Sequence, residues 1–116
     1  MAEILFISSA EGKTMIMGDR FRFISDNVDK APDEAGVYAL YKENELIYYG
    51  RAQGNSVTIR TRLQAHLRGD EGSCTKNATH YRREVCSNPV SREKELLEEY
   101  KKSNSGKLPK CNERIG

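Results

Sequence analysis

The chain has 116 residues, of which 31% are charged and 37% hydrophobic, and its formal net charge is only +2. This length suits one compact domain with one core, and the composition is that of a well-solvated protein. The longest apolar runs, such as residues 4–7, are too short to span a bilayer, and Glu3 does not fit the basic start of a signal peptide. We therefore expect a cytoplasmic protein whose basic surface comes from local clustering of cations rather than from net charge.

The cysteines Cys74, Cys86 and Cys111 are odd in number and widely spaced. No two of them form a C-x-x-C pair, and neither His66 nor His80 stands at zinc-ligand spacing from one. The pattern predicts three free thiols in a reducing compartment and no structural zinc site.

Residues 1–30 are expected to form an N-terminal extension. The runs at 4–7 and 14–17 are β-compatible and flank "SSAEGK", which predicts a hairpin. A polar loop, "SDNVDKAPDEAG", then leads to Gly36.

Two runs rich in tyrosine follow, at 36–41 and 45–49, and they bracket the turn "KENE" as a second hairpin. Side chains alternate between the two faces along a strand, so the loop length fixes which tyrosines share a face. A three-residue loop puts Tyr38 and Tyr48 on the same face, whereas a two-residue loop pairs Tyr38 with Tyr49. The sequence leaves both registers open.

The segment "VTIRTRLQAHLRG" predicts an amphipathic helix that ends at Gly69. Its apolar positions recur at every fourth residue, at Ile59, Leu63 and Leu67. Arg62 and His66 are also four residues apart and therefore lie on one face of the helix. After the polar loop "GDEGSCTKNA", the segment "HYRREVC" is expected to form a third strand.

A second helix is expected in "SNPVSREKELLEEYKK", with Asn88 or Ser91 as its cap and Pro89 in its first turn. The helical spacing puts Glu93 on the side of the apolar stripe, which consists of Leu96, Leu97 and Tyr100. The other acids of the helix fall on more solvated faces. The tail "GKLPKCNERIG" is expected to be a turn and a short extended segment that carries Asn112.

Together these elements resemble a known family. "GVY" at 36–38 and "YYG" at 48–50 are similar to the two signature tripeptides of the GIY-YIG nuclease domain, and an arginine, a glutamate and an asparagine follow in the family's order. The resemblance runs from about Pro32 to Asn112 and implies a nuclease domain over residues 31–116. The implied fold is α/β of the α+β type. A small three-stranded, mainly antiparallel sheet is flanked by two or three helices, with an N-terminal β-extension.

The resemblance also implies a set of catalytic residues, with the helix arginine open between Arg60 and Arg62. The set is Tyr38, Tyr48, Arg62, His66, Glu93 and Asn112. Glu93 would hold one divalent cation, Mg²⁺ or Mn²⁺, with water completing its shell. Arg62 would contact phosphate, and Asn112 would orient the carboxylate or the phosphate.

The proton of the attacking water needs a base. A free tyrosine, with a pKa of about 10, is a poor base at neutral pH. A metal ion and neighbouring cations are expected to lower the pKa of Tyr38 or Tyr48, and His66 would share the role. In contrast, Tyr41 and Tyr49 are expected to be packing residues.

DNA contact is expected from cations clustered around this site, since net charge is small. The candidates are Arg51, Arg60, Arg68 and Lys110. Arg82 and Arg83 are neighbours on a strand and should point to opposite faces. The sequence thus predicts a metal-dependent DNA endonuclease, and the alternative is a DNA- or RNA-binding module on the same scaffold that does not cut. A homodimer or a separate targeting protein is expected as a partner, and no membrane.

Overall fold

A computed structural model describes residues 15–115. In chain order its elements are β1 (Phe21–Arg22), α2 (Ser25–Val28), β2 (Gly36–Lys42), β3 (Glu45–Ala52), α3 (Ile59–Arg68), α4 (Ser73–Lys76), β4 (His80–Val85), α5 (Pro89–Ser103) and α6 (Lys110–Ile115).

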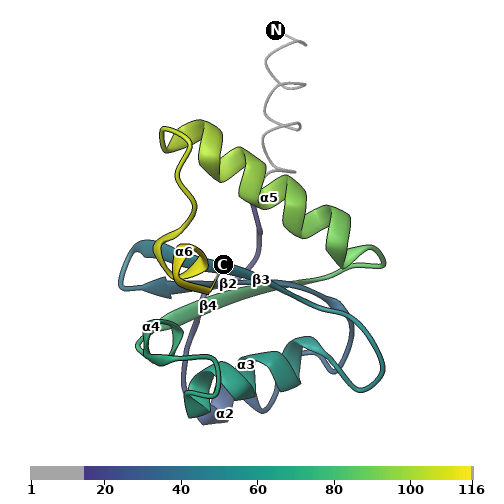
Figure 1. The fold of residues 1–116 in the computed structure, drawn as a ribbon. Coiled ribbons are helices and arrows are strands. Elements are labelled where there is room, and N and C mark those ends of the chain that lie inside the picture. Colours follow the sequence, from purple (N-terminus) through teal and green to yellow (C-terminus); the bar gives the residue numbers. More distant parts are fainter. Residues whose placement is uncertain (1–14, 116) are drawn as a thin grey trace, which may run out of the picture.

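The four strands form one antiparallel sheet in the order β1-β4-β2-β3. Helix α5 covers one face of the sheet, and α2 and α3 lie on the other (Figure 1). The α+β class is confirmed, with one strand more than the three expected. The extra strand is β1, which pairs Phe21 with Tyr81. A strand of two residues is too short to carry an alternating pattern that sequence could reveal.

The tyrosine hairpin has the two-residue turn of one expected register and the shared face of Tyr38 and Tyr48 of the other. The turn between β2 and β3 holds two residues, Glu43 and Asn44, but the pairing shifts at Leu40/Tyr41, so that Leu40 lies opposite Tyr48. This β-bulge inserts one residue and has the same effect on side-chain direction as a longer loop. Tyr38 and Tyr48 consequently lie on the same face.

Both long helices are confirmed. Helix α3 begins after Thr58, whose side chain takes part in a capping box with Thr61, and ends at Gly69 in the left-handed conformation. Helix α5 is capped by the side chain of Asn88, with Pro89 as its first residue. The short helices α2 and α4 lie in segments that were expected to be loops. Helix α6 lies in the tail, for which the prediction of an extended segment is wrong. Four to six residues are too few to show a helical period.

The sheet separates two groups of buried side chains. One includes Tyr38, Tyr48 and Leu63 and lies on the side of α3, and the other includes Tyr49 and Leu96 and lies on the side of α5. Tyr41 also packs on the second group, so the expected packing role of Tyr41 and Tyr49 is confirmed. Phe23, Val28 and Ala31 belong to the first group, so the stretch around β1 and α2 shares the core of the residues that follow it.

The cysteine prediction is wrong for two of the three thiols. Cys74 and Cys111 form a disulfide between α4 and α6, and Cys86 is free. The two half-cystines are 37 residues apart in the chain. Only the fold brings them together, so their spacing gave no signal.

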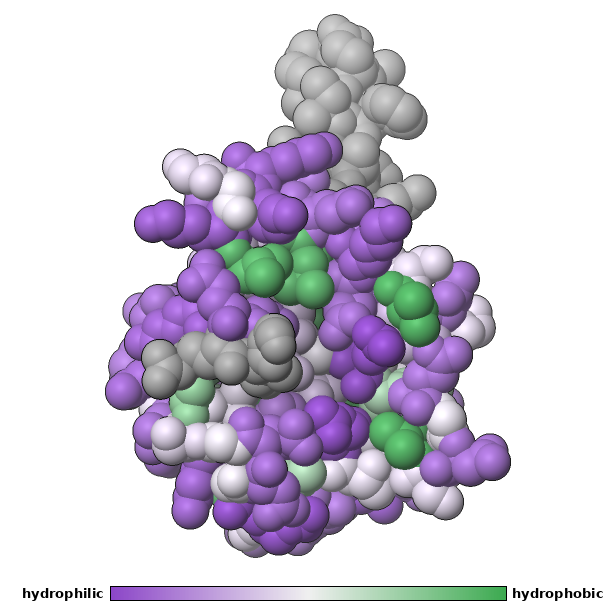
Figure 2. Space-filling view, in the orientation of Figure 1, coloured by the Kyte–Doolittle hydropathy of each residue, from purple (hydrophilic) through white to green (hydrophobic). Residues whose placement is uncertain are grey.

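The expected N-terminal hairpin falls mainly outside the described residues, since 4–7 precede them; residues 15–17 form no strand. Over the described range, no helix is long and apolar enough to cross a membrane. On the face shown in Figure 2 the surface is mostly hydrophilic, and the hydrophobic patches are small and separate.

Candidate active site

The two signature tyrosines meet on the α3 side of the hairpin. The ring centroids of Tyr38 and Tyr48 are 6.2 Å apart, and the side chains are 0% and 8% exposed. Tyr38 lies opposite Gly50 in the register. A Cβ atom at Gly50 would clash with the rings of both tyrosines. The glycine that follows the tyrosine pair is therefore required for the phenols to pack across this strand.

Behind these phenols, a chain of hydrogen bonds runs into the core. Tyr38 Oη lies 2.9 Å from His66 Nε2, and His66 Nδ1 lies 2.8 Å from Thr75 Oγ1. His66 and Thr75 are completely buried. Burial lowers the pKa of His66 to about 4, and the positive charge of Arg62 acts in the same direction. The imidazole is therefore neutral at neutral pH, with one ring nitrogen donating and the other accepting.

A polar pocket of about 290 Å³ opens in front of the phenols. It is lined by Tyr48, Arg51, Gln53, Val57, Arg62 and Glu93. These residues come from β3, α3, α5 and the loop between β3 and α3. The structure thus brings Tyr48, Arg62 and Glu93 to one solvent-accessible pocket, with Tyr38 and His66 behind it.

Arg62 is held in this pocket by an acid that the sequence did not single out. Its Nη1 lies 3.3 Å from Glu71 Oε2. Burial acts to lower the pKa of Arg62, but Tyr38 and Glu71 outweigh it and raise the pKa, so the guanidinium keeps its charge. Arg60, the other candidate for this position, donates its Nε to the carbonyl of Ala31 and does not line the pocket. The geometry therefore favours Arg62 over Arg60 as the site arginine.

The protein alone raises the pKa values of the two tyrosines, whereas a lowering was expected in the presence of a metal ion and cations. Burial raises the pKa of Tyr38 far above its usual value, and the positive charge of Arg62 offsets this only in part. Burial also raises the pKa of Tyr48, again against Arg62. Both phenols are therefore protonated at neutral pH and act there as hydrogen-bonding groups.

Glu93 lies as the helical pattern predicts. Its side chain is 17% exposed, against 48% for Glu95 and 39% for Glu99 on the same helix. Oε1 of Glu93 accepts a hydrogen bond from Arg51 Nη1 at 2.6 Å.

A carboxylate has about four lone-pair positions, so this ion pair leaves Glu93 with capacity for a cation. Within residues 15–115 no group of three or more histidine, cysteine or acidic side chains could hold a metal. Mg²⁺ is often bound through one carboxylate, waters and substrate phosphates. Glu93 beside a polar pocket fits that kind of site.

Asn112 does not have the expected contacts. Its Oδ1 accepts the N–H of Tyr49 and its Nδ2 donates to the carbonyl of Tyr49, both at 2.9 Å. The side-chain amide therefore pairs with the edge of β3 like a neighbouring strand instead of orienting a carboxylate. Through this contact Asn112 positions the strand that carries Tyr48 and Gly50.

Of the four cations expected to contact DNA, only Arg51 lines the pocket. Arg68 forms an ion pair with Asp70 at 2.8 Å, and Lys110 is exposed at the start of α6. Arg82 donates to the hydroxyl of Tyr41, on the α5 side of the sheet, and Arg83 lies over the ring of Phe21. The two neighbours thus point to opposite faces, as predicted.

Four residues that sequence reasoning missed belong to the site or support it. They are Gln53, Val57, Glu71 and Thr75. Glu71 lies in the turn between α3 and α4, and Thr75 lies in the four-residue helix α4. The segment is too short for a periodic pattern to distinguish either residue. The signal in the sequence that could have indicated Glu71 is its acidic side chain shortly after the helix that carries Arg62.

No protein-family model matches the chain, and a search of curated proteins finds no match.

Proposed function

We propose that this chain is a metal-dependent DNA endonuclease with a GIY-YIG-like, single-metal site. One observation carries the proposal. Tyr48, Arg62 and Glu93, which come from three different elements, line one polar pocket, with Tyr38 packed directly behind Tyr48. A group of this kind combines hydrogen-bonding phenols, a fixed positive charge and a carboxylate where a phosphodiester can reach them.

Each residue has a role that its surroundings support. The planar guanidinium of Arg62, held by Glu71, matches phosphate oxygens and neutralises charge that develops on them. Tyr48 is the phenol that borders the pocket, so it positions the attacking water or the phosphate. Tyr38 and His66 are buried behind it, form a hydrogen bond with each other, and pack against the ring of Tyr48.

Glu93 is the residue that would hold the cation, Mg²⁺ or Mn²⁺. When bound, the cation would neutralise phosphate charge and lower the pKa of water and of neighbouring groups. Arg51, 48% exposed at the same pocket, gives Glu93 its position and is available for the phosphate backbone.

The alternative is a DNA- or RNA-binding module that does not cut. The Arg51–Glu93 ion pair favours it, because the guanidinium occupies an oxygen of the carboxylate on which cleavage depends. The finer assignments, a GIY-YIG-like domain over 31–116, a cytoplasmic location, and a homodimer or targeting protein as partner, belong to the proposal as well.

The test is cleavage of supercoiled plasmid, branched DNA and single-stranded DNA, with and without Mg²⁺. Wild type is compared with Glu93→Ala and Arg62→Ala, and with Glu98→Ala as a matched control from an exposed position of α5. We expect cleavage that depends on Mg²⁺ and falls about a hundredfold or more in the first two variants. Full activity in a folded Glu93→Ala chain contradicts the proposal. Salt-sensitive binding with no cleavage in any metal favours the binding module.

A further inference from the structure

We propose that the Cys74–Cys111 disulfide is a redox modification site that controls the candidate active site. When bonded, it holds the supports of the site in place, and reduction by a dithiol releases them. The effect on cleavage rests on the proposed endonuclease function, whereas the effect on the fold can be measured independently of it.

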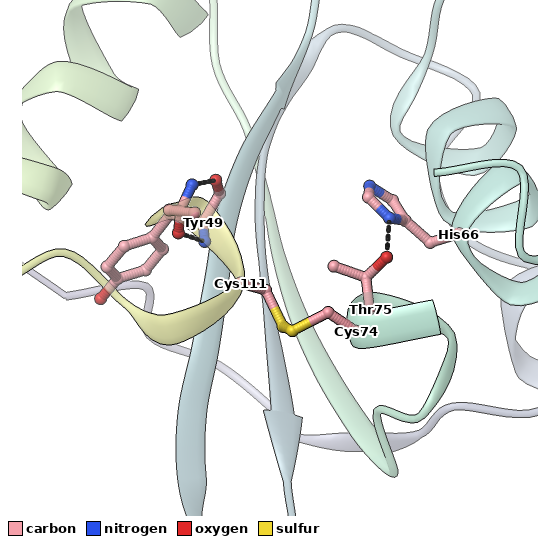
Figure 3. Close-up of a disulfide and its surroundings, with 6 residues drawn as sticks. Tyr49, His66, Cys74, Thr75 and Cys111 are labelled. Atoms are coloured by element: carbon pink, nitrogen blue, oxygen red, sulfur yellow. Dashed lines mark hydrogen bonds between the residues drawn. A yellow bond between two sulfur atoms is a disulfide. The ribbon is translucent and has the colours of Figure 1, made fainter. Parts of the chain in front are cut away.

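Each half-cystine directly precedes a residue that bonds to the site (Figure 3). Cys74 precedes Thr75, whose hydroxyl lies 2.8 Å from Nδ1 of His66. Cys111 precedes Asn112, whose amide makes both hydrogen bonds to the backbone of Tyr49. One covalent bond therefore joins the support of the imidazole to the support of β3.

The two helices that carry these residues are too short to form without tertiary support. Helix α4 has four residues and α6 has six, and isolated helices of that length are not stable in water. The cap residue of α4, Gly72, provides no side-chain hydrogen bond. Their positions therefore depend on the contacts between them and the core, and the disulfide is the covalent one.

Each support reaches the phenols through one intermediate residue. Thr75 bonds to His66, and His66 bonds to Tyr38. Tyr49, held by Asn112, stands between Tyr48 and Gly50, the two residues that pack against Tyr38. Since β3 is the last strand of the sheet, the outward N–H of Tyr49 depends on Asn112 for its partner.

The reduction itself is ordinary thiol–disulfide exchange. Cys111 is fully buried and Cys74 is half-buried, so we assign the attack of the reductant to Cys74. A thiolate of the dithiol attacks Cys74 Sγ, the S–S bond breaks, and Cys111 leaves as a thiolate that takes up a proton. The second thiol of the reductant then attacks the mixed disulfide and releases the thiol of Cys74. The reductant becomes a disulfide, and two electrons pass to the protein.

The experiment uses the full chain with Cys86→Ser, which removes the free thiol and keeps the disulfide. It is studied oxidised and in dithiothreitol, together with Cys74→Ser/Cys111→Ser. Amide hydrogen exchange is followed by NMR at Tyr49 and, as an internal reference, at Ala39 in the central strand β2. Plasmid nicking is measured on the same samples.

We expect exchange at Tyr49 to become at least about tenfold faster on reduction, with Ala39 unchanged, and nicking to fall at least about tenfold. The double serine variant should behave as the reduced chain.

Unchanged exchange at Tyr49 overturns the inference, as does acceleration at Tyr49 and Ala39 alike, which means that reduction unfolds the whole domain. Faster exchange at Tyr49 with unchanged nicking also overturns it and leaves the endonuclease function intact. If neither state cuts any nucleic acid, the proposed function fails, and exchange at Tyr49 alone decides whether the disulfide controls this pocket.

Discussion

The hydroxyl of Tyr38 lies 2.9 Å from Nε2 of His66, and both side chains are fully buried. The residue that the family resemblance implies as a catalytic phenol is thus bonded to an imidazole inside the core, while Tyr48 borders the pocket. The two tyrosines therefore have different surroundings: Tyr38 is enclosed by the core, and Tyr48 faces the pocket.

Removing the hydroxyl of Tyr38 should destabilise the fold. In Tyr38→Phe, Nε2 of His66 loses its partner in a place that water does not reach, and we expect a loss of about 1–3 kcal/mol in the free energy of unfolding. Tyr48→Phe is the matched control, since its ring packing is kept and its side chain borders the open pocket. Urea denaturation of the two variants measures the difference. Equal stability of Tyr38→Phe and wild type would show that the buried bond contributes nothing.

Stability should also depend on pH through His66. Its pKa is about 4 in the folded chain and about 6.5 when unfolded, so the unfolded chain binds the proton more readily between these values. Stability from His66 is therefore present above pH 6.5 and is lost as the pH falls towards 4. The difference amounts to up to about 3 kcal/mol.

The measurement is the free energy of unfolding between pH 4 and 7 for wild type, His66→Gln and His80→Gln. Because other groups titrate in the same range, the quantity of interest is the difference between variants. We expect His66→Gln to flatten the curve and His80→Gln to leave it close to wild type. Two parallel curves for wild type and His66→Gln would refute the assignment.

The parts of the fold that sequence predicted are those with a long, regular pattern. Ile59 and Leu63 recur at helical spacing and are fully buried in α3, and the same reasoning placed Glu93 at the half-buried side of α5. The bulge beside Leu40 could not be predicted, because nothing in the residues marks which position is inserted. It nevertheless decides that Tyr38 and Tyr48 share a face.

The parts that sequence missed depend on contacts between distant segments. Cys111 and Asn112 act on Cys74 and Tyr49, which precede them by 37 and 63 residues. A local pattern contains no information about such partners. The family resemblance implied that Asn112 is a site residue, but in the fold its side chain bonds to the backbone of Tyr49.

Gly50 should tolerate no side chain. A methyl group there would meet the rings of Tyr38 and Tyr48, which are held by the core, and overpacking of this kind costs about 1–3 kcal/mol. We expect Gly50→Ala to lower the melting temperature and to reduce cleavage. In combination with Tyr38→Leu, which removes the ring, the cost of Gly50→Ala should be smaller than in the wild-type background. Strict additivity of the two changes would mean that the contact is not the cause.

Arg51 and Arg60 should have different roles, although the sequence predicts that both contact DNA. Arg51 is 48% exposed at the pocket, whereas Arg60 donates to the carbonyl of Ala31. Arg51→Ala should therefore weaken DNA binding at all sequences and reduce the slope of log K against log salt by about 1. Arg60→Ala should leave that slope near wild type and lower the free energy of unfolding by about 1 kcal/mol, because it removes a hydrogen bond between α3 and the chain before β2. Fluorescence anisotropy with labelled duplex DNA at several salt concentrations, paired with urea denaturation, separates the two effects. The assignment fails if Arg60→Ala changes the salt slope as much as Arg51→Ala does.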